Sequence, residues 1–276
     1  MTQTLKLPPP LEKLISLLRP FWFRGKGRLL NALVKPQGEI IATVFESRMT
    51  LDLSDQIQRN VFLGTFEPTE TKQVIQYLKP GMTFVDVGAN IGYFTALAAS
   101  KVGPHGNVFS IEPSPYAFDR LKRLVDENNL KQVRLAQVGV SSRSGPETLY
   151  VPTQESGNHS PTLLQHSEGS PITIEIKTLD ELVAEWNLEQ IDLLKIDIEG
   201  LEMKAFKGAT QTLAKGKIRA ILCEFNDFWL TSASSSPDEL FQFLLDAGFE
   251  CVSKTQSLSK TPLVTHFFIQ KRMRSL

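Results

Sequence analysis

The residues best suited to chemistry form a glycine-rich turn, Asp86-Val87-Gly88-Ala89-Asn90-Ile91-Gly92, between a strand-like and a helical stretch. Glycines in such a turn let a ligand approach the backbone, and the free N–H groups at the start of the helix can bind it. Glu112 ends the next strand-like stretch, 24 residues after Gly88. A carboxylate at this position can accept hydrogen bonds from both hydroxyls of a ribose. The pattern predicts a nucleoside pocket.

The same turn argues against a nicotinamide dinucleotide as the ligand. A pyrophosphate needs the pattern G-x-G-x-x-G, but the positions two and five after Gly88 are Asn90 and Tyr93. A nucleoside without a diphosphate fits the turn better. S-adenosylmethionine is such a ligand, because it combines adenine, a ribose diol and an amino-acid tail. A nicotinamide-dependent oxidoreductase remains as an alternative.

Acidic residues mark the end of a second apolar strand, in Asp192-Leu193-Leu194-Lys195-Ile196-Asp197-Ile198-Glu199-Gly200-Leu201-Glu202. Asp197 follows this strand at its carboxyl end, where open α/β sheets bind their ligands. It is the first candidate for a general base, because a carboxylate partly withdrawn from water holds a proton more readily near neutral pH. For Glu199 and Glu202, capping of the following helix is as good an explanation as a role in the site. Glu199 and the loop residue His159 are the alternative bases.

A metal site is a further interpretation of the same strand ends. Asp197 with Glu224 and either Asn226 or Asp227 would supply oxygen ligands, which magnesium and calcium prefer. Ordinary polarity at strand ends explains these residues too, so we assign no metal ligand. An apolar wall for a substrate and simple core packing are both compatible with the neighbouring aromatic residues, Phe225, Phe228 and Trp229.

These residues need a scaffold that brings the strand ends together. Strand patterns cover residues 83–87, 107–112, 133–140, 149–152, 172–178, 191–197, 218–225 and 261–272. Helical patterns lie between them at 91–101, 115–129, 201–215 and 236–249. Such alternation predicts an α/β fold with a mostly parallel sheet covered on both faces. We expect residues 1–79, with an amphipathic helix within 11–23, to form an N-terminal cap or leader and residues 80–276 to form the ligand-binding domain.

The composition limits the classes of partner. The 276 residues carry 30 Lys plus Arg and 30 Asp plus Glu, so no net charge attracts nucleic acid. The first sixty residues have an excess of four positive charges, which suits either a peripheral membrane contact or a solvated leader. Only two cysteines occur, Cys223 and Cys251, and no apolar run approaches about 18 residues. These features favour a cytoplasmic protein without a transmembrane segment.

The chain resembles the FkbM family of S-adenosylmethionine-dependent methyltransferases. The resemblance covers residues 64–270 and is carried by FVDVGANIGYFT at 84–95, FSIEPSPYAFDRLKRLVDENN at 109–129, IEIKTLDEL at 174–182, IDLLKIDIEGLEMKAFKGA at 191–209 and GTFEP at 64–68. It implies a class I methyltransferase fold, that is, a Rossmann-like, mostly parallel seven-stranded sheet with helices on both faces, a β insertion and the N-terminal cap. It also implies S-adenosylmethionine as the cofactor.

The resemblance also implies roles for individual residues. Asp197 would act beside the donor or the acceptor, and Glu67 would either close over the donor or be an exposed charge on the cap. Contacts between the turn and the donor are implied for Asp86, Gly88, Asn90 and Gly92. Ribose binding is implied for Glu112, and adenine binding for Gln137 and Gly139.

The activity implied is that of an O-methyltransferase acting on a hydroxyl of a saccharide, a polyketide or a related small metabolite. A methyl group on a sulfonium is already activated, so the protein mainly aligns the acceptor oxygen, excludes water and removes the hydroxyl proton. DNA base methylation is disfavoured, because no Asn/Asp-Pro-Pro-aromatic clamp for a flipped base follows the acidic strand. The alternative is a donor-binding module without catalysis in a biosynthetic or membrane-surface assembly.

Overall fold

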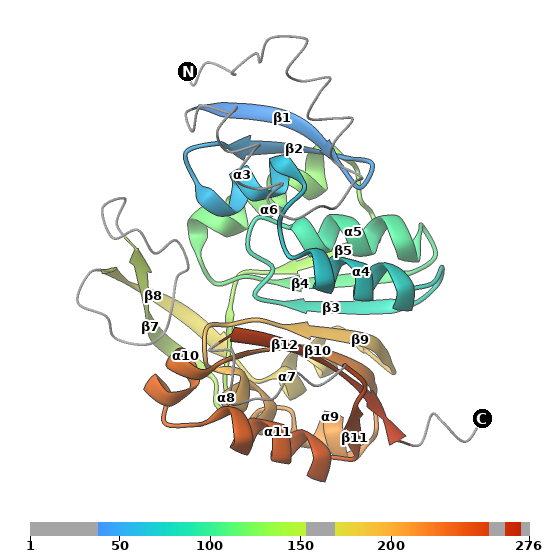
Figure 1. Cartoon of the computed structure of the whole chain (residues 1–276), viewed down its shortest axis with the longest axis vertical. Coiled ribbons are helices and arrows are strands. Elements are labelled where there is room, and N and C mark those ends of the chain that lie inside the picture. Colours follow the sequence, from blue (N-terminus) through green and yellow to red (C-terminus); the bar gives the residue numbers. More distant parts are fainter. Residues whose placement is uncertain (1–37, 153–168, 254–262, 272–276) are drawn as a thin grey trace.

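The structure is a computed structural model that describes residues 38–152, 169–253 and 263–271. A seven-stranded sheet forms its centre (Figure 1). In spatial order the strands are β11 (Phe249–Cys251), β12 (Leu263–Gln270), β10 (Ile218–Asn226), β9 (Ile191–Ile196), β3 (Thr83–Val87), β4 (Asn107–Ile111) and β5 (Val133–Ala136). The neighbours from β10 to β5 are all parallel, and β12 is antiparallel to β10 and β11. The predicted mostly parallel seven-stranded sheet is confirmed.

Side chains that alternate along the strands pack on both faces of the sheet. Phe84 belongs to one buried cluster, and its neighbours Val85 and Val87 belong to another. The first cluster includes residues of α4 (Pro68–Tyr77), α5 (Tyr93–Val102) and α6 (Pro115–Glu127); the second includes residues of α7 (Leu179–Glu185), α8 (Glu202–Lys207) and α11 (Pro237–Asp246). Helices therefore cover both faces, as predicted. Among the residues that the structure describes, no helix has the length and apolar character needed to cross a membrane.

The described part of the predicted N-terminal cap packs directly on this domain. It comprises a hairpin of β1 (Glu39–Val44) and β2 (Ser47–Asp52), then α3 (Gln56–Leu63) and α4. Leu51 of the hairpin and Val74 of α4 lie in the same buried cluster as Phe84. Arg120 of α6 also forms an ion pair with Glu39 at 2.7 Å. The domain division at residue 79 stays a prediction, and the helix predicted within 11–23 lies outside the described residues.

Two predicted elements are divided in the structure. The strand predicted at 133–140 leaves the central sheet after Ala136 and continues as β6 (Gly139–Val140). β6 pairs with β8 (Gly169–Lys177), which pairs with β7 (Gly145–Pro152), and these three strands form the predicted β insertion. The helix predicted at 201–215 is broken into α8 and α9 (Thr210–Ala214). Gly208 lies at this break against Ser141, where a Cβ atom would stand 2.2 Å from the Ser141 carbonyl oxygen.

Candidate active site

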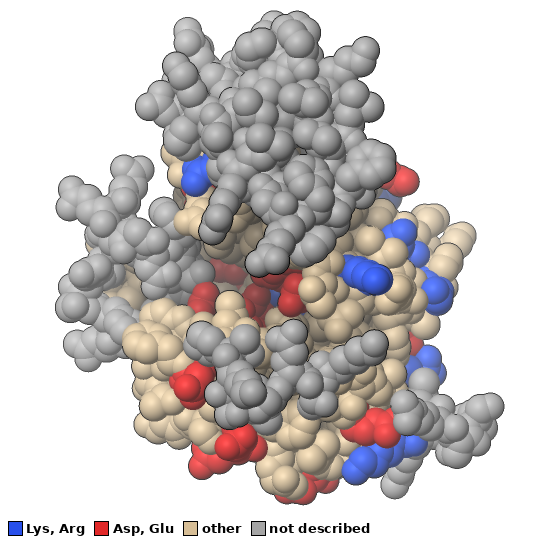
Figure 2. Space-filling view, viewed as in Figure 1, with Lys and Arg blue, Asp and Glu red and all other residues tan. Residues whose placement is uncertain are grey.

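A pocket lies at the carboxyl ends of β3, β4, β9 and β10. Its described walls come from the glycine turn, from the segments that follow β4 and β9, from Glu224 of β10, from β6 and from the segment before α4. Figure 2 shows acidic side chains gathered in a hollow on this face of the molecule. The pocket has the position expected for a ligand site in an open α/β sheet.

The glycine turn and the loop after β9 touch each other at the floor of the pocket. Gly88 has φ +84°, and a Cβ atom there would stand 1.9 Å from the carbonyl oxygen of Asp197. Asn90, also left-handed with φ +48°, lines the pocket. Its side chain type tolerates this conformation better than most. The sequence of the turn is therefore explained by a close approach of two backbones and by tight chain geometry.

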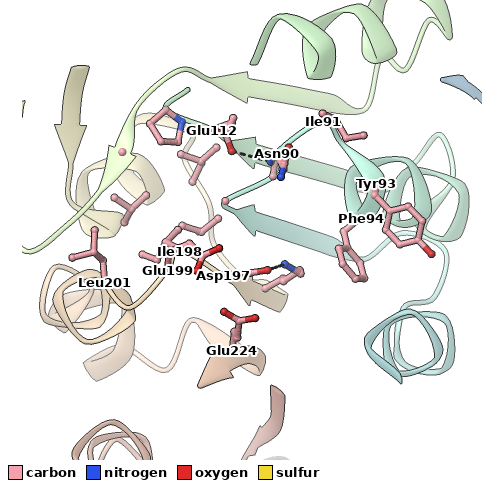
Figure 3. Close-up of a pocket in the computed structure, with 18 of the residues that line it drawn as sticks. Asn90, Ile91, Tyr93, Phe94, Glu112, Asp197, Ile198, Glu199, Leu201 and Glu224 are labelled. Carbon is pink, nitrogen blue, oxygen red and sulfur yellow. Dashed lines mark hydrogen bonds and ion pairs between the residues drawn. The ribbon is translucent and has the colours of Figure 1, made fainter. Parts of the chain in front are cut away.

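Glu112 faces the pocket from the end of β4 and is almost completely buried. One carboxylate oxygen accepts a hydrogen bond from the Asn90 backbone N–H at 2.8 Å, and the other accepts one from the Ser114 N–H at 2.9 Å. Figure 3 shows Asn90 and Glu112 side by side. Burial raises the pKa of Glu112 to about 7, although these two N–H donors oppose the rise. The side chain is thus fixed in orientation and titrates near neutral pH.

Three of the residues expected at the donor lie elsewhere. Asp86 is fully buried beneath the pocket and does not line it; its carboxylate accepts a hydrogen bond from Thr95 Oγ1 at 2.9 Å. Gly92 packs α5 against α6, because a Cβ atom there would stand 2.5 Å from the Leu124 side chain. Gln137 is exposed outside the pocket, whereas Gly139 lines it. Asp86 and Gly92 therefore support the residues around the pocket without lining it.

Asp197 lines the other side of the pocket and forms an ion pair that the sequence did not predict. Its Oδ2 atom lies 3.0 Å from Nζ of Lys195, in β9. The Asp197 side chain is 23% exposed and that of Lys195 only 5%, so the pair runs from the pocket into the sheet. The lysine ammonium also lies 4.7 Å from the centre of the Phe94 ring. A lysine inside an otherwise apolar strand was the signal that could have found it.

Two further carboxylates line this acidic side. Glu224 lies two residues before the end of β10, and Figure 3 places it below Asp197. Burial, with Asp197 next in size, raises the pKa of Glu224 well above its ordinary value. Glu67 stands at the start of α4 with φ +36°, and burial raises its pKa to about 8. Its buried Oε2 atom has no hydrogen-bond partner among the residues that the structure describes. Glu67 therefore lies at the pocket, as one of the two interpretations of this residue expected, and is not an exposed charge.

The loop after β9 is held by a buried carboxylate at the start of α8. Glu202 Oε1 accepts hydrogen bonds from the N–H groups of Ile198, at 2.9 Å, and Gly200, at 3.3 Å. Gly200 leaves room for the backbone of Trp229, since a Cβ atom would stand 2.4 Å from it. Glu199, with φ +53°, lines the pocket between these anchors. Glu202 thus anchors the loop before α8 and does not cap the N-terminus of that helix, and Glu199 lines the pocket.

The remaining candidates contribute less to the pocket. Phe225 and Trp229 are buried, whereas Phe228 is 61% exposed, and none of the three lines the pocket. The described residues contain no group of three or more His, Cys, Asp or Glu side chains that could hold a metal ion. The alternative base His159 lies outside the described residues.

Comparison with known proteins gives two family matches. The profile of the methyltransferase FkbM domain matches residues 86–251, which include the glycine turn, Glu112 and the loop after β9. A second profile, that of protein-L-isoaspartate(D-aspartate) O-methyltransferase, matches residues 24–147. Among solved structures, methyltransferase FkbM from Methylobacillus flagellatus KT is 16% identical, with a TM-score of 0.46 over 78% of this chain and 55% of that one.

Three curated relatives illustrate the similarity. The hexuronic acid methyltransferase AglP of Haloferax volcanii is 35% identical over 46% of this chain and 50% of its own length. The 2-O-methyltransferase NoeI of Sinorhizobium fredii is 28% identical over 59% of this chain and 73% of its own length. The 31-O-demethyl-FK506 methyltransferase FkbM of Streptomyces tacrolimicus is 27% identical over 66% and 77%. The chain thus spans half of the first relative and about three quarters of the other two.

Proposed function

The chain belongs to the FkbM family of S-adenosylmethionine-dependent methyltransferases, and we propose that it methylates a hydroxyl of a saccharide, a polyketide or a related small metabolite. The names of its relatives support this acceptor class, since they include a 2-O-methyltransferase, a hexuronic acid methyltransferase and a 31-O-demethyl-FK506 methyltransferase. The observation that carries the proposal is that one pocket joins Glu112 and the glycine turn on one side to the Asp197–Lys195 pair on the other.

The side of the pocket between β3 and β4 fits the nucleoside part of the donor. Each oxygen of the Glu112 carboxylate accepts one backbone N–H and keeps capacity for a ribose hydroxyl. Ile111, Pro113 and Val138 offer apolar surface to the adenine ring. S-adenosylmethionine supplies, when bound, a methyl group on a positively charged sulfur. The carboxylates that line the pocket favour such a cation.

Asp197 is the proposed general base, and its place in the pocket lining supports this role. In this proposal its Oδ1 atom takes the hydroxyl proton while the hydroxyl oxygen takes the methyl group and the carbon–sulfur bond breaks. Its Oδ2 atom is already bound to Lys195, so one oxygen remains for the substrate. Glu199, which lines the pocket from the same loop, is the alternative proton acceptor.

Product analysis with a matched pair of variants tests this proposal. Wild-type protein, Asp197→Asn and Asp119→Asn would be incubated with methyl-labelled S-adenosylmethionine and a panel of glycosides and hydroxylated polyketides. Asp119 is an exposed carboxylate on α6 that does not line the pocket, and its variant is the control. We expect a methyl ether from wild type and from the control, and a rate about 10²- to 10⁴-fold lower from Asp197→Asn.

Donor binding separates loss of catalysis from loss of the fold. The affinity of Asp197→Asn for S-adenosylmethionine should stay within about threefold of wild type, because the ribose and adenine contacts are unchanged. If wild type binds the donor but methylates no acceptor, the proposed activity is contradicted and a donor-binding module without catalysis is favoured. If Asp197→Asn is as fast as wild type, Asp197 is not the base.

A further inference from the structure

Lys195 is a charged residue in the middle of the buried sheet. It lies on β9 between Asp86 of β3 and Leu222 of β10 in the strand register, and only 4% of it is exposed. An amine buried in this way costs free energy unless it is paired. The carboxylates that act on it come from three other segments as well as its own: Asp197 after β9, Asp86 on β3, Glu67 before α4 and Glu224 on β10.

Only one of these carboxylates is bonded to the ammonium. Asp197 Oδ2 lies 3.0 Å from Lys195 Nζ, and the Phe94 ring lies 4.7 Å away from the same nitrogen. Asp86 instead accepts a hydrogen bond from Thr95. Residues two apart on an extended strand point to the same side, so Lys195 and Asp197 face each other along the strand end. In Figure 3 this contact is the dashed line that starts at Asp197.

We propose that Lys195 is a positioning residue for methyl transfer, which holds the Asp197 carboxylate through Oδ2 and leaves Oδ1 directed at the acceptor hydroxyl. The inference rests on the proposed function, in which Asp197 takes the hydroxyl proton. Lys195 acts through Asp197 and does not itself touch the acceptor.

A lysine suits this role because its charge persists at the site. Burial alone would lower the pKa of Lys195, but Asp197, Glu67 and Asp86 raise it above its ordinary value. The ammonium therefore remains a hydrogen-bond donor throughout the range in which an enzyme works. The ring of Phe94 and the strands around the side chain limit the directions that the ammonium can take, which fixes the carboxylate as well.

A double-mutant cycle tests the inference. The variants are Lys195→Met, Asp197→Asn, the two combined, and Lys204→Met, which removes an exposed lysine of α8 as the control. We expect Lys195→Met to lower kcat about 10²-fold with a small change in KM, because a misplaced base slows the chemical step. Lys195→Arg should recover part of the loss, since it keeps a cation near Asp197.

The combined variant decides between a positioning and a purely structural role. If Lys195 acts through Asp197, adding Lys195→Met to Asp197→Asn slows it by no more than about threefold. A further loss as large as in the wild-type background would overturn the inference. So would a Lys195→Met enzyme as fast as wild type. Should Lys195→Met alone not fold, the combined variant, which removes the ion pair as a whole, still gives this comparison against Asp197→Asn.

A crystallographic readout keeps this test separate from that of the proposed function. In crystals of Lys195→Met, or of Lys195→Arg if Lys195→Met does not fold, the Asp197 carboxylate is expected to leave its present orientation. An unchanged carboxylate would contradict the positioning role. A wild-type protein with no methyl transfer would instead contradict the proposed function, whatever the crystals show.

Discussion

At the scale of single residues, the site consists of carboxylates whose surroundings change their chemistry. Burial raises the pKa of Glu112 to about 7 and that of Glu67 to about 8, so both titrate where most solution carboxylates are fully ionised. The positive charge of Lys195 opposes part of the rise in the pKa of Glu67. Because a cationic ligand favours the ionised carboxylates, ligand binding and proton release should be coupled here.

The affinity for S-adenosylmethionine should therefore depend on pH through Glu112. As the pH falls below the pKa of about 7, the carboxyl takes up a proton and loses both its charge and part of its capacity to accept from the ribose. We expect the affinity to rise from pH 6 to pH 8. Glu112→Gln should lower the affinity at pH 8 about 10- to 100-fold and flatten this rise.

Equilibrium binding measurements on two variants check this prediction. Glu189→Gln, in an exposed segment outside the donor pocket, is the matched control and should bind like wild type. The role of Glu112 would be refuted by a Glu112→Gln protein with wild-type affinity at both pH values.

The position of a residue along the chain decides whether its place in the site can be predicted from the sequence. Glu112 and Asp197 directly follow apolar strands, so the sequence alone places them at the pocket. Lys195 was not predicted, although it stands in an apolar strand two residues before its partner Asp197; only the Phe94 ring beside its ammonium is brought there by the fold. Asp86 does not line the pocket, because its buried carboxylate accepts a hydrogen bond from Thr95, and its contact with the donor stays a prediction.

At the scale of elements, the contact between the turn after β3 and the loop after β9 decides the shape of the site. Gly88 and Gly81 make a matched pair, because their φ angles are +84° and +85° but only Gly88 has neighbours in the way of a Cβ atom. Gly81→Ala should lower the free energy of unfolding by about 1 kcal/mol through backbone strain alone. Gly88→Ala should lower it further and abolish donor binding, because Cβ would overlap the Asp197 carbonyl.

Urea unfolding and donor titration of the two variants measure this difference. Equal losses of stability, with donor binding retained in Gly88→Ala, would contradict the contact between the two loops.

Elements were predictable where a single periodic pattern fixes them. The apolar runs of β3, β9 and β10 were correctly predicted as strands, whereas the short edge strand β11 was missed, because Phe249 was assigned to the preceding helix. The breaks at 136–139 and at Gly208 were missed, because both depend on contacts distant in sequence. β6 leaves the sheet to pair with β8, and Gly208 is pressed against Ser141.

At the scale of the whole molecule, a neutral chain has an acidic pocket. The sequence carries equal numbers of acidic and basic residues, but the described lining of the pocket has five carboxylates and one ammonium. The sheet order produces this concentration, because it brings the carboxyl ends of β3, β4, β9 and β10 to one place. A cationic nucleoside is thus favoured over an anionic dinucleotide of similar size.

Calorimetric titration of the folded wild-type protein at pH 8 tests this central claim most directly. S-adenosylmethionine should give saturable heat with one molecule bound per chain, and a large excess of NAD⁺ should neither give heat nor displace it. A folded protein that binds no S-adenosylmethionine, or that exchanges it for NAD⁺, would contradict the account.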